Sequence, residues 1–386
     1  MPTFLTRCAA LWLLAVLSSV EVGIAQDATP ERIDALVQQL GDTKFVNRAE
    51  AEAKLLEIGT AAREALREAR QSDDLEIRYR ALRLEELIQK QAHQNLLDRF
   101  LKEPTNNEVA ALLPGWERFH KTVGSGKSDR LLFAQMQRTE PELMRLAEQA
   151  SPRDGERIAR RVREIKRLLR DSSAGAVSAP NISAVVFACS HPLARLPKDV
   201  APTVSSIVHH TKFSSKLKAN PEGVERRLIG QWLKSEDGGI DYQKTRFAMQ
   251  FELREGVVPA QRVLESGATG HMLLYALLAC GQLGSTAQLP QLERFFADTT
   301  LVTRSQAKTD AYHTQVRDVA LLCALHATKQ DHKNYGYERV RRRTSTLFDT
   351  NSCGFETDVA RDSAFQLWEM WKASRLQPSR GARTTD

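Results

Sequence analysis

Hydrophobic residues recur at helical spacing in the first part of the chain. A helix is expected to begin at Pro30, with Thr29 as its N-cap. Its apolar face consists of Ile33, Leu36, Val37 and Leu40. Three further short helices are predicted to bury, in turn, Ala49, Ala53 and Leu56; Ala62, Ala65, Leu66 and Ala69; and Ile77, Ala81, Leu84 and Ile88. Because a short helix with one apolar stripe cannot bury it alone, these helices are expected to pack together.

The motif Arg-x-x-Ala occurs near the start of four predicted helices. Its members are Arg48/Ala51, Arg78/Ala81, Arg317/Ala320 and Arg361/Ala364. A small alanine lets two helices approach closely, and an arginine there can donate hydrogen bonds to carbonyls or to an aspartate of an adjacent turn. The residues predicted to stabilise helix stacking, rather than to bind a ligand, are Arg48, Arg78, Arg317, Asp318 and Arg361.

Residues 40–88 resemble two consecutive HEAT-type helical repeats. Besides the arginine motif, the resemblance rests on Ile58-Gly59 at a turn, followed by a helix that contains Leu66. The same arrangement returns near the C-terminus, where Leu283-Gly284 is followed by Leu292. The resemblance implies an all-α fold, a HEAT-like α-solenoid of antiparallel helix pairs with a less regular helical middle region.

A wider resemblance covers most of residues 30–375. Residues 112–144, 315–338 and 354–371 are similar to uncharacterised secreted HEAT-like proteins of planctomycete-type bacteria. This second resemblance implies the same fold and export from the cytoplasm. It implies no activity, so it leaves the mechanism open.

Residues 1–25 have the pattern of a secretory signal peptide. Arg7 precedes an apolar stretch from Cys8 to Val20, and Gly23 and Ala25 are small residues at positions −3 and −1 of a cleavage point. The stretch is shorter than the ~20 residues that span a bilayer. We therefore expect export to the periplasm, cell surface or exterior, with no transmembrane segment after cleavage. An uncleaved N-terminal anchor is the alternative.

The pattern predicts six segments after one another along the chain. They are a signal peptide at 1–25, N-terminal HEAT-like repeats at 26–103, a helical middle region at 104–171, a linker at 172–180, a C-terminal HEAT-like helical region at 181–376 and a disordered tail at 377–386. The linker is predicted from its richness in Ser, Ala and Gly, and the tail from its polar, basic composition.

Composition agrees with a helical chain and excludes a small disulfide-stapled fold. Aromatic residues make up 6% of the chain, and no stretch alternates apolar and polar residues as strands do. Four cysteines follow the signal segment, widely and irregularly spaced: Cys189, Cys280, Cys323 and Cys353. Cys280 and Cys323 lie in apolar segments and are expected to be small core residues. Whether any of the four form a disulfide stays open.

Two local patterns resemble a phosphate-binding loop and a metal site, but each is better explained by a structural role. Residues 124–128, GSGKS, lack the first glycine of a phosphate-binding loop, since that position is Lys121, and they are expected to be a polar loop between helices. His209 and His210 are adjacent, so their side chains point about 100° apart on a helix and are poorly placed to share a metal. No catalytic residue, cofactor or metal site is predicted.

The chain carries a formal net charge of +7, and its arginines gather in two clusters. The candidate binding surface consists of Arg157, Arg160, Arg161 and Arg163 in one cluster and Arg339, Arg341, Arg342 and Arg343 in the other. Cationic helix faces can bind phosphate backbones or anionic polymers, although a solvated face is the commoner outcome. Export favours polysaccharides, lipid headgroups or acidic proteins over nucleic acids.

These observations favour a non-enzymatic scaffold or binding module of the cell envelope or exterior. It would present a partly cationic helical-repeat surface to a protein or an anionic polymer, without a small-molecule cofactor. One alternative is an enzyme whose site consists of dispersed polar residues between repeats. Another is a nucleic-acid-binding HEAT-like protein. The partner and the oligomeric state cannot be predicted.

Overall fold

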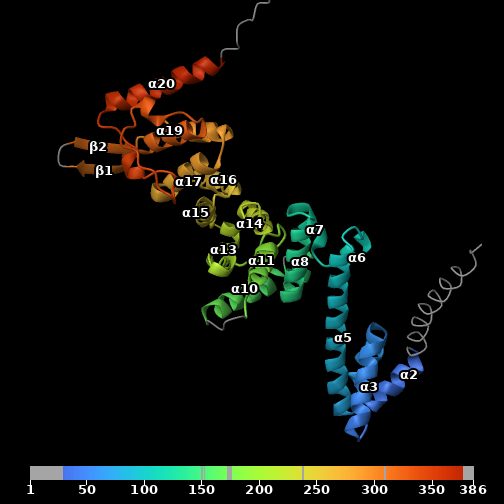
Figure 1. The fold of residues 1–386 in the computed structure, drawn as a ribbon. Helices are drawn as coiled ribbons and strands as arrows, with labels where there is room; N and C mark the ends of the chain where they lie inside the picture. The colour runs from blue at the N-terminus through green and yellow to red at the C-terminus, as the bar shows by residue number, and fades with distance from the viewer. Residues whose placement is uncertain are drawn as a thin grey trace, which may run out of the picture. The chain divides into compact units, whose positions relative to one another are not determined.

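The structure, a computed structural model, describes residues 29–148, 151, 153–171, 176–236, 239–307 and 310–376, with the backbone alone for 303–312. The predicted signal peptide at 1–25 and the predicted tail at 377–386 lie outside these residues. The chain is mostly helical and divides into two compact units, the first ending at Leu112 and the second beginning at Leu113. Each unit is described by itself (Figure 1).

The N-terminal unit is entirely helical over its described residues. Its elements are α2 (Pro30–Gln39), α3 (Phe45–Ile58), the 3-10 helix η1 (Gly59–Ala62), α4 (Arg63–Ala69), α5 (Leu75–Lys102) and α6 (Asn107–Ala111). Thr29 caps α2 as predicted, and Asp74 accepts hydrogen bonds from the backbone N–H groups of Glu76 and Ile77 at the start of α5. The helix predicted around Ile77 continues for 28 residues.

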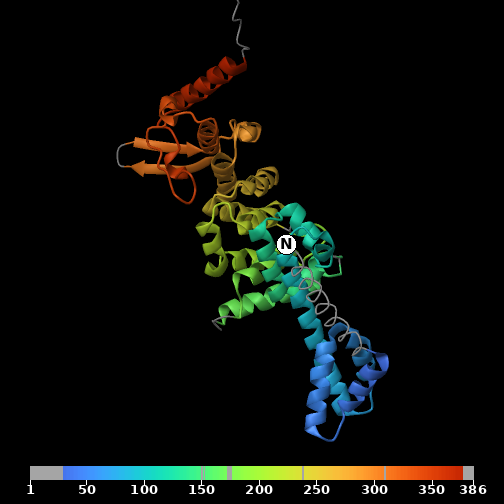
Figure 2. The same ribbon diagram turned by 45° about the vertical axis from the view of Figure 1, so that its right-hand side comes forward.

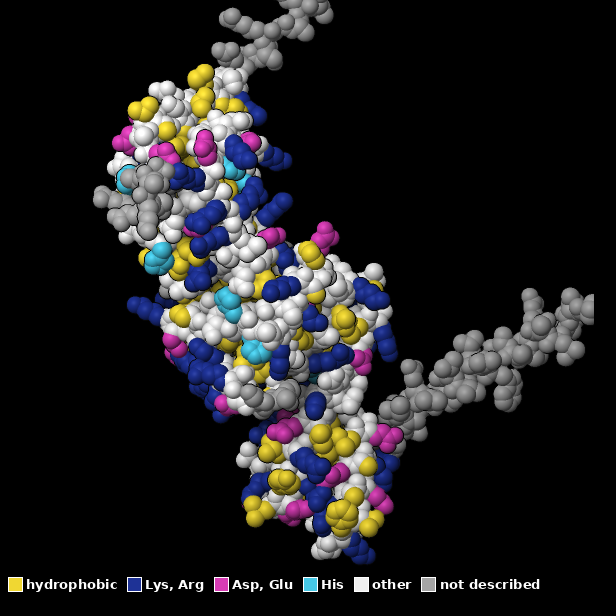
Figure 3. Space-filling view, turned by 60° about the vertical axis from the view of Figure 1, so that its left-hand side comes forward, with side chains coloured by type: hydrophobic (Ala, Val, Ile, Leu, Met, Phe, Trp, Pro, Cys, Tyr) yellow, Lys and Arg dark blue, Asp and Glu magenta, His cyan; other side chains and the backbone are white. Residues whose placement is uncertain are grey.

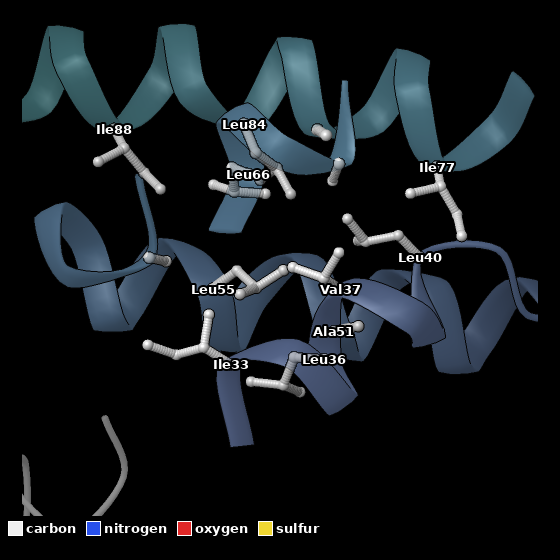
Figure 4. Close-up of a cluster of buried hydrophobic side chains, with 13 residues drawn as sticks. Ile33, Leu36, Val37, Leu40, Ala51, Leu55, Leu66, Ile77, Leu84 and Ile88 are labelled. Carbon is white, nitrogen blue, oxygen red and sulfur yellow. The ribbon is translucent and has the colours of Figure 1, made fainter. Parts of the chain in front are cut away.

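The core of this unit lies between α2, α3, α4 and the first half of α5 (Figure 4). The predicted faces of α2, α4 and α5 are confirmed, since Ile33, Leu66 and Leu84 are buried there. The predicted face of α3 is wrong. Ala51 and Leu55 are fully buried, whereas Leu56 is 41% exposed. Alanines lie all around this helix, so residue spacing alone does not distinguish the face with Leu55 from the face with Leu56.

The first part of the C-terminal unit consists of short helices. They are α7 (Trp116–Thr122), α8 (Lys127–Thr139), α9 (Pro141–Glu148), α10 (Gly155–Arg170), α11 (Ala179–Cys189), α12 (Val200–Val208), α13 (Thr211–Ala219) and α14 (Val224–Lys234). The central one, α11, has buried side chains from Asn181 to Cys189, and it contacts α8, α9, α10, α12, α13 and α14. A helix that is apolar on all sides is typical of a core position.

The second part of this unit contains helices and one hairpin. Its elements are α15 (Asp241–Phe251), η2 (Arg254–Gly256), α16 (Val257–Glu265), α17 (Gly270–Leu283), η3 (Thr286–Gln288), α18 (Leu289–Glu293), β1 (Leu301–Ala307), β2 (Asp310–Gln315), α19 (Val316–Ala327), η4 (His332–Tyr335), η5 (Thr350–Ser352) and α20 (Asp358–Leu376). The strands run antiparallel, side by side (Figure 2). This hairpin was not predicted, because its strands are short and carry few apolar residues.

Part of the predicted linker belongs to a helix and its cap. Residues 172–175 lie outside the described residues, but Val177 is buried and Ser178 forms a capping box with Asn181. Ala179 and Pro180 form the first turn of α11.

The four described cysteines are buried free thiols. Cys280 and Cys323 are core residues, as predicted, and burial raises the pKa of the Cys280 thiol to about 12. In the part of the chain that the structure describes, no helix has both the length and the apolar character that crossing a membrane requires.

Candidate functional site

A cavity in the C-terminal unit lies where α7, α11 and α14 meet the segment 190–199. Its volume is about 780 Å³, in the range of small-molecule sites. Its charged and polar lining consists of Arg118, Thr122, Ser190, His191, Arg195, Lys198, Gln231, Lys234, Ser235 and Glu236. Four of these carry a fixed positive charge and one a negative charge. The cavity is therefore cationic.

Arg118, on α7, is the most buried of the cations that line this cavity. Its guanidinium stacks on the ring of Phe187 of α11, with 3.6 Å between the guanidinium carbon and the ring centroid. One terminal nitrogen donates to the carbonyl of Phe187 at 2.6 Å, and the other makes a long bond of 3.4 Å to Ser190 Oγ. Burial lowers the pKa of Arg118 to about 9, so this side chain is charged at neutral pH.

Three exposed cations lie around the cavity: Arg195, Lys198 and Lys234. No carboxylate lies within ion-pair distance of any of them among the described residues. Glu236 lines the same cavity without forming an ion pair with them. An unpaired cation retains its full attraction for an anion from solution, and low-dielectric walls strengthen that attraction.

The segment 190–199, which supplies half of the lining, is held by α10 at its middle and at its last residue. A side chain at Gly155, the first residue of α10, would overlap the carbonyl oxygen of Arg195, so only glycine allows this approach. Arg163 of α10 binds both carboxylate oxygens of Asp199, at 2.8 and 2.9 Å. Within the segment, His191 Nδ1 accepts the N–H of Leu193 at 3.1 Å.

His191 is the imidazole among the residues that line the cavity. Burial, and secondly the positive charge of Arg118, lower the pKa of His191. The imidazole is therefore neutral at pH 7. Since its Nδ1 accepts a hydrogen bond, the proton of the neutral ring is assigned to Nε2.

Most of the predicted binding arginines on α10 form ion pairs with neighbouring carboxylates. Arg157 pairs with Glu142 and Asp154, and Arg163 with Asp199 and Glu156. Arg161 binds Glu140 through two hydrogen bonds of 2.8 Å, which raise the pKa of Arg161. Of the four predicted residues only Arg160 has no such pair within the described chain. These carboxylates reduce the positive field that the sequence pattern predicts.

The second predicted cluster is compensated in the same way. Arg339 pairs with Glu356 at 2.6 Å. Arg341 and Arg343 share the buried Asp349, at 2.9 and 3.4 Å. Arg342 lies between them, with its backbone bridged to Phe348. Among the described residues, no ion pair or hydrogen bond joins the first arginine cluster to the second.

Arg48 and Arg78 bind backbone carbonyls of the turn before their own helix. Arg48 donates to the carbonyl of Asp42 at 2.6 Å, and Arg78 to that of Ser72 at 2.8 Å, each six residues earlier. Arg48 also lies 3.4 Å from a carboxylate oxygen of Glu76, which joins α3 to α5. The predicted hydrogen bonds are present, and they are mostly local.

The three other predicted stacking residues lie at the start of α19 and α20. Arg317 binds Gln315 at 2.6 Å, a local contact. Asp318 and Arg361 form a buried ion pair of 2.8 Å between the two helices. Burial raises the pKa of Asp318 to about 6, against hydrogen bonds that favour the carboxylate, so it is charged at neutral pH.

Arginines elsewhere in the C-terminal unit also bind the carbonyls at helix ends. Arg226 donates to the carbonyls of Leu217, Phe251 and Glu252, and Arg262 to those of Leu233, Lys234 and Ser235. The last carbonyls of a helix lack partners within the helix, and cations there also interact favourably with the helix dipole. Much of the arginine content therefore serves the fold, which sequence composition cannot reveal.

The two local patterns set aside in the sequence analysis have structural roles. Gly126 caps α8, with its N–H bound by Asp129 at 2.9 Å, so residues 124–128 lead into a helix and follow no strand. His209 contacts the ring of Phe247 and the carbonyl of Ser205. No group of three or more His, Cys, Asp or Glu side chains is arranged to hold a metal ion within the described residues.

No family model, curated protein or solved structure matches this chain. The HEAT-like resemblance therefore stays a prediction, and function has to be argued from the cavity and its charges.

Sequence reasoning missed the cavity residues. Arg118, His191, Lys198 and Lys234 are scattered over more than a hundred positions and share no periodicity. A local signal existed in residues 190–199, where two prolines and three basic residues interrupt the helical pattern.

Proposed function

We propose that this chain is a non-enzymatic binding module that holds an anionic polymer at a cationic surface of its C-terminal unit. The proposal includes a HEAT-like solenoid of antiparallel helix pairs and export to the cell envelope or exterior. Repeat surfaces of this kind commonly bind extended partners.

One observation supports the proposal above the others. The cations without carboxylate partners in the described chain include a group on two adjoining elements of this unit. They are Arg153, Arg160, Arg167 and Arg170 on or beside α10, and Arg195 and Lys198 in the segment 190–199. The two elements meet where Gly155 contacts the backbone of Arg195. On the face shown in Figure 3, Lys and Arg side chains outnumber Asp and Glu over the C-terminal unit.

The character of the site favours binding over catalysis. Acid–base catalysis needs one group that donates a proton and another that accepts one, each with a pKa near the working pH. The cavity instead collects fixed positive charges, with one neutral histidine and one glutamate. Fixed cations attract a polyanion and release its counterions, which makes the affinity depend steeply on salt.

The test measures binding of residues 26–386 to an acidic polysaccharide, such as a polyuronate, as a function of salt. A variant with R153Q, R160Q, R167Q and R170Q should bind at least about tenfold more weakly at low salt, with a shallower salt dependence. The matched control changes four exposed cations of the N-terminal unit: K44Q, K54Q, R83Q and K90Q. Equal affinities for the two variants, or no binding by the parent chain, would overturn the proposal.

A double-stranded DNA of equal charge is included as a second polyanion. Stronger binding to DNA than to the polysaccharide would support the nucleic-acid alternative and count against the proposed class of partner.

A further inference from the structure

The cavity beneath Arg195 and Lys198 has features that a merely cationic surface does not need. It is concave, it is lined by three separate stretches of the chain, and its innermost cation, Arg118, is held in place by the Phe187 ring and carbonyl. A guanidinium fixed in this way loses little conformational entropy when an anion binds to it.

We propose that this cavity is a distinct site for one small oxyanion group, a carboxylate, sulfate or phosphate, with Arg118 as the inner contact and Arg195, Lys198 and Lys234 as outer contacts. This proposal rests on the proposed function only in taking an anionic ligand. The two sites can act independently, because a polymer can bind the outer surface without entering the cavity.

The charge balance of the cavity supports an anionic occupant. Arg118 is mostly buried, and its hydrogen bonds within the described residues go to a neutral carbonyl and a neutral hydroxyl rather than to a carboxylate. A buried charge without a counter-charge is costly, and a bound oxyanion would remove part of that cost. The contact to Ser190 is 3.4 Å long, so one terminal nitrogen of Arg118 is only weakly engaged. Arginine is well suited to planar, bidentate contact with oxyanions.

The size of the cavity indicates what can carry the oxyanion. About 780 Å³ accommodates a small organic acid or a terminal acidic sugar. Both sources present the same group to Arg118. Pro192, Pro197 and Ala194 supply apolar walls beside the cations, which suits a ligand with a carbon skeleton better than a bare ion.

The experiment titrates residues 26–386 with glucuronate, citrate, inorganic sulfate and inorganic phosphate by calorimetry at low ionic strength. We expect one site per chain for at least one of these probes. K198Q changes an exposed residue and should weaken the affinity about tenfold. A194W should abolish binding, because the indole fills the cavity. The matched control K216Q changes an exposed lysine of α13 outside the cavity and should alter the affinity less than about twofold.

R118Q should also abolish binding, but this arginine contributes to packing, so K198Q and A194W keep the test independent of folding. Absence of binding by every probe, or equal affinities for A194W and K216Q, would overturn the proposal. Polysaccharide binding is measured on A194W in parallel. If A194W no longer binds the small anion but still binds the polymer, the cavity is a separate site. If the polymer fails to bind the parent chain while glucuronate binds, the polymer proposal fails and the cavity site stands.

Discussion

Arg361 at the start of α20 and Asp318 at the start of α19 form an ion pair in which both side chains are almost completely buried, with 2% and 0% of their surfaces exposed. Each partner is also bound by the backbone. Asp318 accepts the N–H of Gln315 at 2.8 Å, and Arg361 donates to the carbonyl of His313 at 2.9 Å. The pair therefore joins two helices and the end of the hairpin, with its hydrogen-bonding groups satisfied.

Removing one member of this pair should be among the most destabilising changes in the C-terminal unit. R361M leaves the Asp318 carboxylate buried without its cation, which costs about 3–5 kcal/mol in comparable pairs. The measurement is the free energy of unfolding from denaturant titration. D358N removes the exposed partner of Arg361 and should cost under about 1 kcal/mol. Similar losses for the two variants would contradict the role of the buried pair.

This pair shows what the sequence can predict. Asp318 and Arg361 follow helix-start signals, so their placement at adjoining helix ends was expected from pattern alone. The pairing of Arg157, Arg161 and Arg163 with distant carboxylates was not expected, because Glu142, Glu140 and Asp199 lie 15 to 36 residues away and are positioned by tertiary packing. Charge clusters in a sequence thus overestimate the free positive charge of a surface.

Two other differences between the predicted and the observed fold also arise because tertiary contacts leave no local sequence pattern. Face assignment in α3 failed because alanine contributes little hydrophobic contrast, and Leu55 and Leu56 compete for the core. The hairpin was missed because β1 and β2 are stabilised by their own pairing and by the neighbouring loop around Phe355, contacts that have no local sequence pattern.

Two ion pairs of α10 should differ sharply in their contribution to stability. Arg161 binds Glu140, which is 3% exposed and also accepts a hydrogen bond from Asn181 at 2.7 Å. R161Q should lower the free energy of unfolding by about 2–3 kcal/mol, less than for a fully buried pair because Arg161 is partly exposed. R163Q breaks a pair that is exposed on both sides and should leave the unfolding midpoint within error. Equal midpoints for the two variants would refute this.

Gly155 should control the cavity through the backbone of Arg195. G155A places a methyl group where the Arg195 carbonyl now lies, so the segment 190–199 has to move and oxyanion affinity should fall severalfold. The control is G126A, whose methyl group would lie 3.4 Å from Asp129, an ordinary contact. Calorimetric titration of both variants with glucuronate checks the prediction. An unchanged affinity in G155A would show that the close contact between Gly155 and the Arg195 carbonyl does not position the segment for binding.

Stability should decrease as the pH falls below about 6.5, partly through two histidines that contact Phe348. Burial, and then the charge of Arg342, lower the pKa of His326; burial likewise lowers the pKa of His332, where Asp331 opposes the effect and Arg342 and Lys333 add to it. A folded-state pKa below the unfolded value of 6.5 means that the unfolded chain binds more protons. The stabilisation is thus complete above pH 6.5 and lost as the pH falls through the folded pKa.

The change that tests this is the double variant H326Q and H332Q. Its free energy of unfolding should vary less between pH 7.5 and 5.5 (about one unit either side of the unfolded pKa) than that of the parent chain. H271Q, in an exposed position on α17, controls for the loss of an imidazole. An unchanged slope in the double variant would assign the acid sensitivity to other groups.

Arg78 should stabilise the start of α5 in the N-terminal unit through its hydrogen bond to the carbonyl of Ser72. R78M keeps the aliphatic stem but removes the donor, and a hydrogen bond from a charged group contributes about 1.5 kcal/mol. The amides of residues 75–88 should then exchange hydrogen about tenfold faster, because 1.4 kcal/mol corresponds to a tenfold change in the opening equilibrium. Arg83 lies on the exposed side of the same helix, so R83M is a matched control that should leave the exchange unchanged. Equal exchange rates in R78M and R83M would show that water replaces the arginine without loss, and that the Arg-x-x-Ala motif matters in this unit only for the close packing of Ala81.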